Sequence, residues 1–196
     1  MSQDIVIAGV GGQGTVLASR IIAEAAILAN QPVFTSETIG MAQREGCVTS
    51  NVRIGEPLYG AVIPDGKADV LIGFELAETV RLLPKLKPGG TVIANATKIV
   101  PVSVATGKSV YNEAQLSEYL NEWPGSCYIF DASRLAEEAG SFKAVNIVML
   151  GALSTLPDLL FTSEQLLEAI LAMVPPKTTE INKKAFLAGR QALGGS

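Results

Sequence analysis

A short apolar run, a glycine-rich loop and an amphipathic segment follow one another near the amino end, and this succession restricts the fold more than any other feature. Residues 5–8 (IVIA) are mostly β-branched and glycine follows them, which predicts a buried parallel strand. GVGGQG follows at residues 9–14, and residues 15–29 carry apolar side chains at helical spacing. With a second strand expected at residues 32–36, the segment predicts a right-handed β-α-β unit.

Strand and helix signals alternate through most of the remaining sequence. Strands are expected at residues 48–54, 68–73, 91–95 and 127–131, with helices at 75–83 and 133–139, the second helix capped by Ser133. The last third is expected to be helical, at residues 146–153, 163–174 and 180–193. This order predicts one α/β domain over residues 1–196: a three-layer, mostly parallel, Rossmann-like sheet with helices on both faces and a helical C-terminal third. Residues 48–54 and 100–104 do not fit β-α-β units, so a mixed sheet is the alternative.

Composition argues against several classes of function. The chain has no histidine, so no serine or cysteine nucleophile can pair with a histidine base. Its two cysteines are fewer than the four ligands that an iron–sulfur cluster requires, and a disulfide between them is not expected in the cytoplasm. The net charge of −4 argues against nucleic acid as a partner. No signal peptide and no apolar run of about 18 residues is evident, so we expect a cytoplasmic protein without a membrane span.

Gly9, Gly11 and Gly14 match the pattern G-x-G-x-x-G of dinucleotide-binding proteins, and Glu37 follows about 20 residues later. Glycines there permit a tight turn and let an anion approach the amides of a helix N-terminus. The two interpretations are binding of NAD or flavin, and a turn that only folds the chain. The GGQG run and the polar segment SETIGMAQREG differ from the usual fingerprint, and the chain is too short for a separate substrate domain.

Longer segments are more specific than the glycines alone. GVGGQG, SETIGMAQREGCVTSNVRIG and ADVLIGFELAE resemble the gamma subunit or gamma domain of the 2-oxoacid:ferredoxin oxidoreductases, and most closely the indolepyruvate branch of that family. The resemblance continues in KPGGTVIAN, NIVMLGAL and NKKAFLAG, so it spans nearly the whole chain.

The resemblance implies a division of labour between subunits. A large partner would carry thiamine diphosphate and the iron–sulfur clusters, whereas the gamma chain would bind no cofactor tightly and would contact coenzyme A. The implied reaction is CoA-dependent oxidative decarboxylation of a 2-oxoacid, here an aryl pyruvate, with electrons passing through the complex to ferredoxin. We expect the isolated chain to be inactive, and a homodimer is an option for it. The alternatives are a free-standing NAD-binding dehydrogenase and a scaffold subunit without a ligand.

Candidate ligand contacts gather in loops and at strand ends. Thr15, in the first helical turn, is expected either to cap the helix or to contact the same anion. Ser36 and Glu37 end the second strand, where open α/β sheets form their ligand crevice. Arg44 and Arg53 offer planar guanidinium donors to phosphate or carboxylate, with a surface ion pair and a solvent-facing position as their structural alternatives. The candidate set is Gly9, Gly11, Gly12, Gln13, Gly14, Thr15, Ser36, Glu37, Arg44 and Arg53, and no catalytic or metal-binding residue is expected.

The segment 38–46, expected as a loop or short helix, combines Ile39 and Met41 with Arg44. Such a mixture of apolar side chains with arginine is enriched in protein interfaces, and it predicts a contact with the large subunit. Asn146 is expected to cap the helix that it begins. Cys47 is expected to be a small buried side chain.

Overall fold

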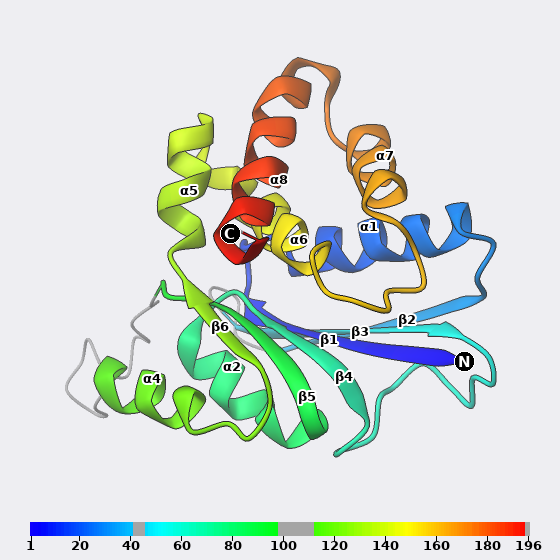
Figure 1. Ribbon diagram of the computed structural model, residues 1–196, viewed down its shortest axis with the longest axis vertical. Coiled ribbons are helices and arrows are strands. Elements are labelled where there is room, and N and C mark those ends of the chain that lie inside the picture. Colours follow the sequence, from blue (N-terminus) through cyan, green and yellow to red (C-terminus); the bar gives the residue numbers. More distant parts are fainter. Residues whose placement is uncertain (41–45, 98–111, 195–196) are drawn as a thin grey trace.

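The computed structural model describes residues 1–40, 46–97 and 112–194, which build a six-stranded sheet in the order β2-β3-β1-β4-β5-β6 (Figure 1). β1, β4, β5 and β6 pair in parallel, whereas β3 is antiparallel to both β1 and β2. The mixed alternative is therefore the correct description of this Rossmann-like sheet. The strands are β1 (Ser2–Val10), β2 (Val33–Ile39), β3 (Cys47–Gly55), β4 (Ala68–Gly73), β5 (Leu86–Asn95) and β6 (Cys127–Phe130).

The second strand does not lie beside the first, as a simple β-α-β unit would require. β1 continues through the glycine loop into α1 (Thr15–Leu28), and β2 then runs in the direction of β1 with β3 inserted between them. The register pairs Gly9 with Val48, and Val48 with Ile39. The end of β2 and the start of β3 therefore lie at the same end of the sheet as the glycine loop. Ile39 belongs to strand β2, although a loop was expected there.

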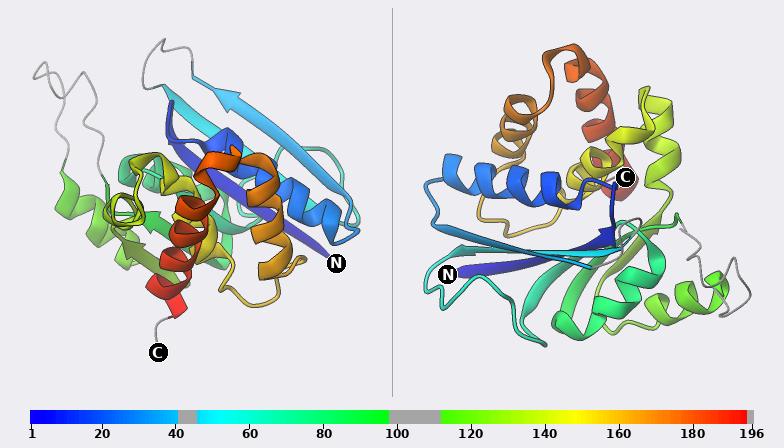
Figure 2. Two further views of the ribbon diagram at one scale, coloured as in Figure 1. Left: turned by 90° about the horizontal axis from the view of Figure 1, so that it is seen from above. Right: turned by 180° about the vertical axis from the view of Figure 1, so that it is seen from behind.

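Helices cover both faces of the sheet, as expected (Figures 1 and 2). The two faces have separate apolar clusters, because side chains of β1 alternate between them: Ile5 and Ile7 belong to one cluster, Val6 and Ala8 to the other. None of the described helices is long and apolar enough to cross a membrane. One face carries α1, α5 (Ala132–Ala139), α6 (Val145–Leu153), α7 (Ser163–Met173) and α8 (Thr179–Gly194); the other carries α2 (Leu76–Leu82) and α4 (Glu113–Asn121).

Short 3-10 helices η1 (Leu83–Lys85), η2 (Phe142–Ala144) and η3 (Pro176–Thr178) connect these elements. Asp131, rather than the expected Ser133, caps α5, because its carboxylate already accepts the amide of Arg134 at 2.9 Å. Ser133 therefore lies inside the first turn of the helix.

α6 and α8 pack with their backbones in contact. A Cβ on Gly151 would lie 2.1 Å from the carbonyl oxygen of Phe186, and a Cβ on Gly189 would lie 1.9 Å from that of Val148. Only glycine permits this approach, since any side chain would push the helices apart. The contact holds α6, which is buried from residue 146 to residue 153, against α8.

Candidate functional site

A cleft of about 630 Å³ opens at the carboxyl end of β1, where the glycine loop enters α1. Residues 11–14 and Leu17 form one wall, while Glu137 of α5, Lys143 of η2 and Asn146 of α6 stand on the other. Open α/β sheets bind ligands at the carboxyl ends of their strands, and the volume is typical of small-molecule sites. This cleft is the candidate ligand site.

The glycine loop presents an uncapped helix N-terminus to the cleft. Gly12 and Gly14 have φ angles of +92° and +81°, a region that glycine adopts with little strain. Gly14 is the N-cap of α1, where among the described residues no side chain accepts from the helix amides and no acidic residue lies in the first turn. The first amides of a helix have no acceptor within the helix and carry partial positive charge, so this end of α1 favours an anion.

Gln13 faces inward and fastens the loop to the sheet. Its Oε1 accepts from the amide of Val10 at 2.8 Å, and its Nε2 donates to the carbonyl oxygen of Phe74 at 3.0 Å. A Cβ on Gly9 would lie 2.7 Å from the same Oε1. Gln13 thus holds the loop against the sheet, and Gly9 leaves room for its side chain. The backbone of Gly12 and Gly14 faces the cleft.

Asn146 does not cap α6, contrary to the sequence-based expectation. The helix already begins at Val145, with Ala144 in the cap position, so Asn146 lies within its first turn. Its Oδ1 accepts from the amide of Ile147 at 3.0 Å. Its Nδ2 lies against the glycine loop, because a Cβ on Gly14 would be 2.8 Å from that nitrogen.

Lys143 and Phe142 stand exposed at the rim of the cleft, with the Lys143 Nζ 6.0 Å from the centroid of the Phe142 ring. Neither these residues nor Asn146 and Glu137 were among the sequence-based candidates. They reach the loop only because η2, α5 and α6 pack beside α1. The one available signal was the segment NIVMLGAL, whose first residue is Asn146.

Arg53 forms a nearly buried ion pair at the other end of β1. Its Nε and Nη2 donate to the Asp4 carboxylate at 2.8 and 3.0 Å, its Nη1 donates to the carbonyl oxygen of Gly60 at 3.1 Å, and only 12% of its side chain is exposed. The register places it opposite Asp4, roughly 16 Å along β1 from Gly9. The structure therefore does not bring Arg53 to the cleft.

Ser36 and Glu37 also lie away from the cleft. Ser36 Oγ donates to the carbonyl oxygen of Ala61 at 3.0 Å, and Glu37 Oε1 accepts from Ser19 Oγ of α1 at 3.3 Å. In a dinucleotide fingerprint the acidic residue follows the strand next to β1. Here β3 occupies that position, so Glu37 is one strand farther from the loop. Thr15, the first residue of α1, is buried.

Arg44 lies outside the described residues. Gly46, which follows that segment, accepts a hydrogen bond from the amide of Gly11 at 2.9 Å, so the β2–β3 hairpin meets the glycine loop. Cys47, the next residue, is exposed and not buried as expected; it is the first residue of β3, where the strand begins.

The donor set of the chain does not fit an iron–sulfur cluster. Cys47 begins β3 and Cys127 begins β6, which lie four positions apart in the sheet. At about 4.8 Å per strand, the two thiols are separated by roughly 19 Å or more. They cannot share a cluster or form a disulfide.

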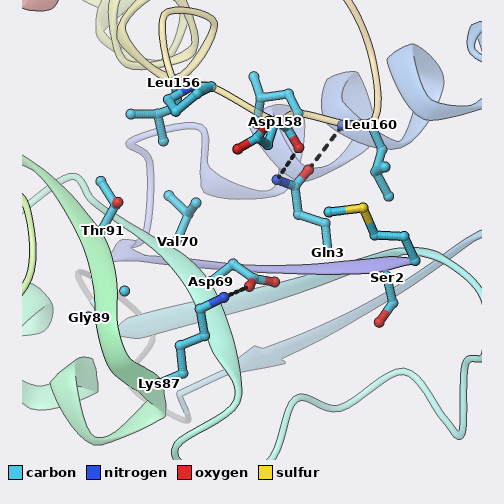
Figure 3. Close-up of a pocket in the computed structure, with 14 residues that line it drawn as sticks. Ser2, Gln3, Asp69, Val70, Lys87, Gly89, Thr91, Leu156, Asp158 and Leu160 are labelled. Atoms are coloured by element: carbon cyan, nitrogen blue, oxygen red, sulfur yellow. Dashed lines mark hydrogen bonds and ion pairs between the residues drawn. The ribbon is translucent and has the colours of Figure 1, made fainter.

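A second cavity, of about 250 Å³, lies at the opposite end of the strands, near the starts of β1, β4 and β5 (Figure 3). Three of its polar side chains, Gln3, Asp69 and Lys87, are engaged with the protein itself. Asp69 pairs with Lys87 and accepts from the amide of Asp4 at 2.7 Å, while Gln3 Oε1 accepts from the amide of Leu160 at 3.3 Å. It lies at the amino ends of the parallel strands, which makes it a weaker candidate than the cleft.

Residues 4–192 match the family described as pyruvate ferredoxin/flavodoxin oxidoreductase. Indolepyruvate oxidoreductase subunit IorB of Thermococcus kodakarensis is 43% identical over 191 residues, covering 96% of this chain and 95% of that protein. The crystal structure of a keto/oxoacid ferredoxin oxidoreductase gamma subunit from Geobacter sulfurreducens PCA has a TM-score of 0.73 and 26% identity, covering 99% of each chain.

A likeness of fold alone extends to a larger protein. The 2-oxoglutarate:ferredoxin oxidoreductase from Magnetococcus marinus, with 2-oxoglutarate, coenzyme A and succinyl-CoA bound, has a TM-score of 0.73 at 24% identity. The match covers 100% of this chain and 31% of that one.

Proposed function

Since the chain belongs to the pyruvate ferredoxin/flavodoxin oxidoreductase family, as its sequence segments indicated, we propose that it is the small subunit of a 2-oxoacid:ferredoxin oxidoreductase that acts on aryl pyruvates such as indolepyruvate. The complex converts the 2-oxoacid and coenzyme A into an acyl-CoA and carbon dioxide, and two electrons pass to ferredoxin. The 43% identity with an indolepyruvate oxidoreductase subunit supports this substrate class.

The observation that carries the proposal is the anion-binding geometry of the cleft. Coenzyme A contains a diphosphate, which suits the open amides at the start of α1 and the ammonium group of Lys143. The position of β3 between β1 and β2 argues against the NAD-binding alternative, because Glu37 is displaced from the place of a ribose-binding carboxylate. A ligand contact by this chain also distinguishes the proposal from a pure scaffold.

Thiamine diphosphate and the iron–sulfur clusters are assigned to a large partner subunit. This follows from the family resemblance, and the wide separation of Cys47 and Cys127 is in accord with it. The small subunit then contributes binding and positioning rather than bond-making chemistry.

Two exposed apolar side chains support a partner that covers the mouth of the cleft. Ile39 at the end of β2 is 65% exposed, and Phe142 at the cleft rim is 66% exposed. Ile39 lies at the same end of the sheet as the glycine loop, and Phe142 lines the cleft. Apolar and aromatic side chains gathered at one edge are typical of interface cores.

Co-expression with the large thiamine- and cluster-bearing subunit tests this proposal. We expect the two chains to co-purify and to reduce ferredoxin with indolepyruvate and coenzyme A, faster than with pyruvate or 2-oxoglutarate. Arg44→Glu is expected to weaken the complex. A chain that does not bind the large subunit and that NADH stabilises against heat would overturn the proposal in favour of the dehydrogenase.

A further inference from the structure

We propose that Asn146 and the N-terminus of α1 together bind one phosphoryl group in the cleft, with Asn146 Nδ2 and Lys143 Nζ as its side-chain donors. The inference deepens the proposed function, and it rests on that function only for the source of the phosphoryl group. Asn146 is then a ligand-binding residue of the small subunit rather than a helix cap.

The orientation of the Asn146 side chain is fixed by its own helix. Oδ1 accepts from the amide of Ile147 at 3.0 Å, which directs Nδ2 away from α6 and toward the glycine loop. The residue is only 3% exposed, and it lines the cleft. Among the described residues none accepts a hydrogen bond from this nitrogen. The Nδ2 atom itself is accessible from the cleft, so a ligand held there can accept its hydrogen bond.

The glycine loop supplies the complementary half of the site. Gly14 lets Nδ2 approach closely, since a Cβ there would lie 2.8 Å away, and no atom lies within 4 Å of a Cβ built on Gly12. The backbone amides at the start of α1 and the Asn146 amide therefore border the same space. An oxyanion held there receives neutral hydrogen-bond donors from two sides.

The charged groups around this space suit an anionic ligand. Lys143 stands at the rim, and among the residues the structure describes no carboxylate forms an ion pair with it, so its ammonium group can meet a ligand. Glu137 faces the same cleft from α5. Coenzyme A and NAD both contain a diphosphate, and inorganic pyrophosphate is the smallest probe of that group.

The test is a titration of the ¹⁵N-labelled full-length chain with inorganic pyrophosphate. We expect the side-chain amide resonances of Asn146 to shift together with the backbone amides of residues 12–15. Asn146→Asp should weaken binding roughly tenfold to a hundredfold, because a hydrogen bond to a charged group is lost and a repelling carboxylate is gained. Asn112→Asp adds the same charge at the start of α4, on the opposite face of the sheet, and should leave binding unchanged.

Two exposed lysines form a second matched pair. Lys143→Gln should weaken pyrophosphate binding, whereas Lys67→Gln, at the amino edge of the sheet, should not. Coenzyme A should displace pyrophosphate, and NADH should not. Displacement by NADH alone would leave the anion site standing and would remove the proposed function.

The titration of the unaltered chain decides the matter even where Asn146→Asp fails to fold. Asn146 resonances that stay in place while the amides of residues 12–15 shift would overturn the inference. So would a folded Asn146→Asp variant that binds pyrophosphate as the unaltered chain does. CoA-dependent turnover of the whole complex that is unaffected by Asn146→Asp would remove the site and leave the proposed function intact.

Discussion

A Cβ on Gly14 would lie 2.8 Å from Nδ2 of Asn146. The N-cap of α1 and the first turn of α6 are thereby in direct contact, although most strands of the sheet lie between them in the sequence. The contact makes the shape of the cleft depend on a single missing methyl group.

Gly14→Ala should therefore destabilise the chain more than Gly12→Ala. Both substitutions force a residue with a side chain into positive φ, which costs about 1–2 kcal/mol. Only Gly14→Ala also meets the Asn146 side chain, which adds about 1–3 kcal/mol. Urea unfolding monitored by circular dichroism measures both. Equal losses for the two variants would mean that Asn146 moves away freely.

Gly12→Leu should impair ligand binding more than it impairs folding. Its backbone strain matches that of Gly12→Ala, but its longer side chain extends into the open cleft. We expect similar midpoints of urea unfolding for the two variants, and a coenzyme A affinity that falls only for Gly12→Leu. Calorimetric titration measures the affinity, and an unchanged value would place the ligand elsewhere.

Gln13→Glu should loosen the loop although the two side chains have the same shape. A carboxylate has no N–H to donate to the carbonyl oxygen of Phe74, and that oxygen would be left facing another acceptor. A loss of about 1–3 kcal/mol in the free energy of unfolding is expected. Gln191→Glu, an exposed position of α8, is the control and should change stability by less than about 0.5 kcal/mol.

Arg53→Gln should unfold the chain at lower urea without altering ligand binding. The Asp4 carboxylate, of which 9% of the side chain is exposed, would lose its partner, and breaking such a pair costs about 3–5 kcal/mol. Lys183→Gln breaks the exposed pair with Glu180 and should cost less than about 1 kcal/mol. If Arg53→Gln kept its stability and lost affinity for coenzyme A, a ligand-binding role for Arg53 would be restored.

The two cysteines should differ in reactivity and in its dependence on pH. Burial raises the pKa of the Cys127 thiol, so at a given pH a smaller share of it is the reactive thiolate. Cys47 is exposed and should alkylate first with iodoacetamide at pH 8. The rate at Cys127 should keep rising with pH beyond the ordinary pKa of a thiol. Mass spectrometry of quenched samples gives both rates, and equal rates at pH 8 would contradict the burial of Cys127.

Local signals predicted the elements that depend on local sequence. The β-branched run of β1, the apolar stripe of α1 and the buried β4 were recognised because each pattern is complete within one segment. The position of β3 was not recognised, since strand order is set by pairing between distant segments. That one insertion also explains why Glu37 does not lie beside the glycine loop, since the expectation assumed that β2 would neighbour β1.

The site was half predictable for the same reason. The glycine loop is contiguous in sequence, and its strand-to-helix position was expected correctly. Asn146 and Lys143 belong to other elements and reach the cleft through the packing of η2 and α6 beside α1. The sequence indicates that Asn146 is a polar residue near the start of a helix. Whether it caps the helix or lies inside its first turn depends on a shift of one residue in the helix start, which no sequence pattern specifies.

The glycine contacts between α6 and α8 determine when the cleft can form during synthesis of the chain. The glycine loop leaves the ribosome early, but the opposite wall of its cleft is held in place by Gly189, near the other end of the chain. At about 5–20 residues per second, roughly 10–35 s of translation separate the two. A nascent or truncated subunit therefore carries the loop without the site, and only a chain translated through α8 can present a finished cleft to its partner.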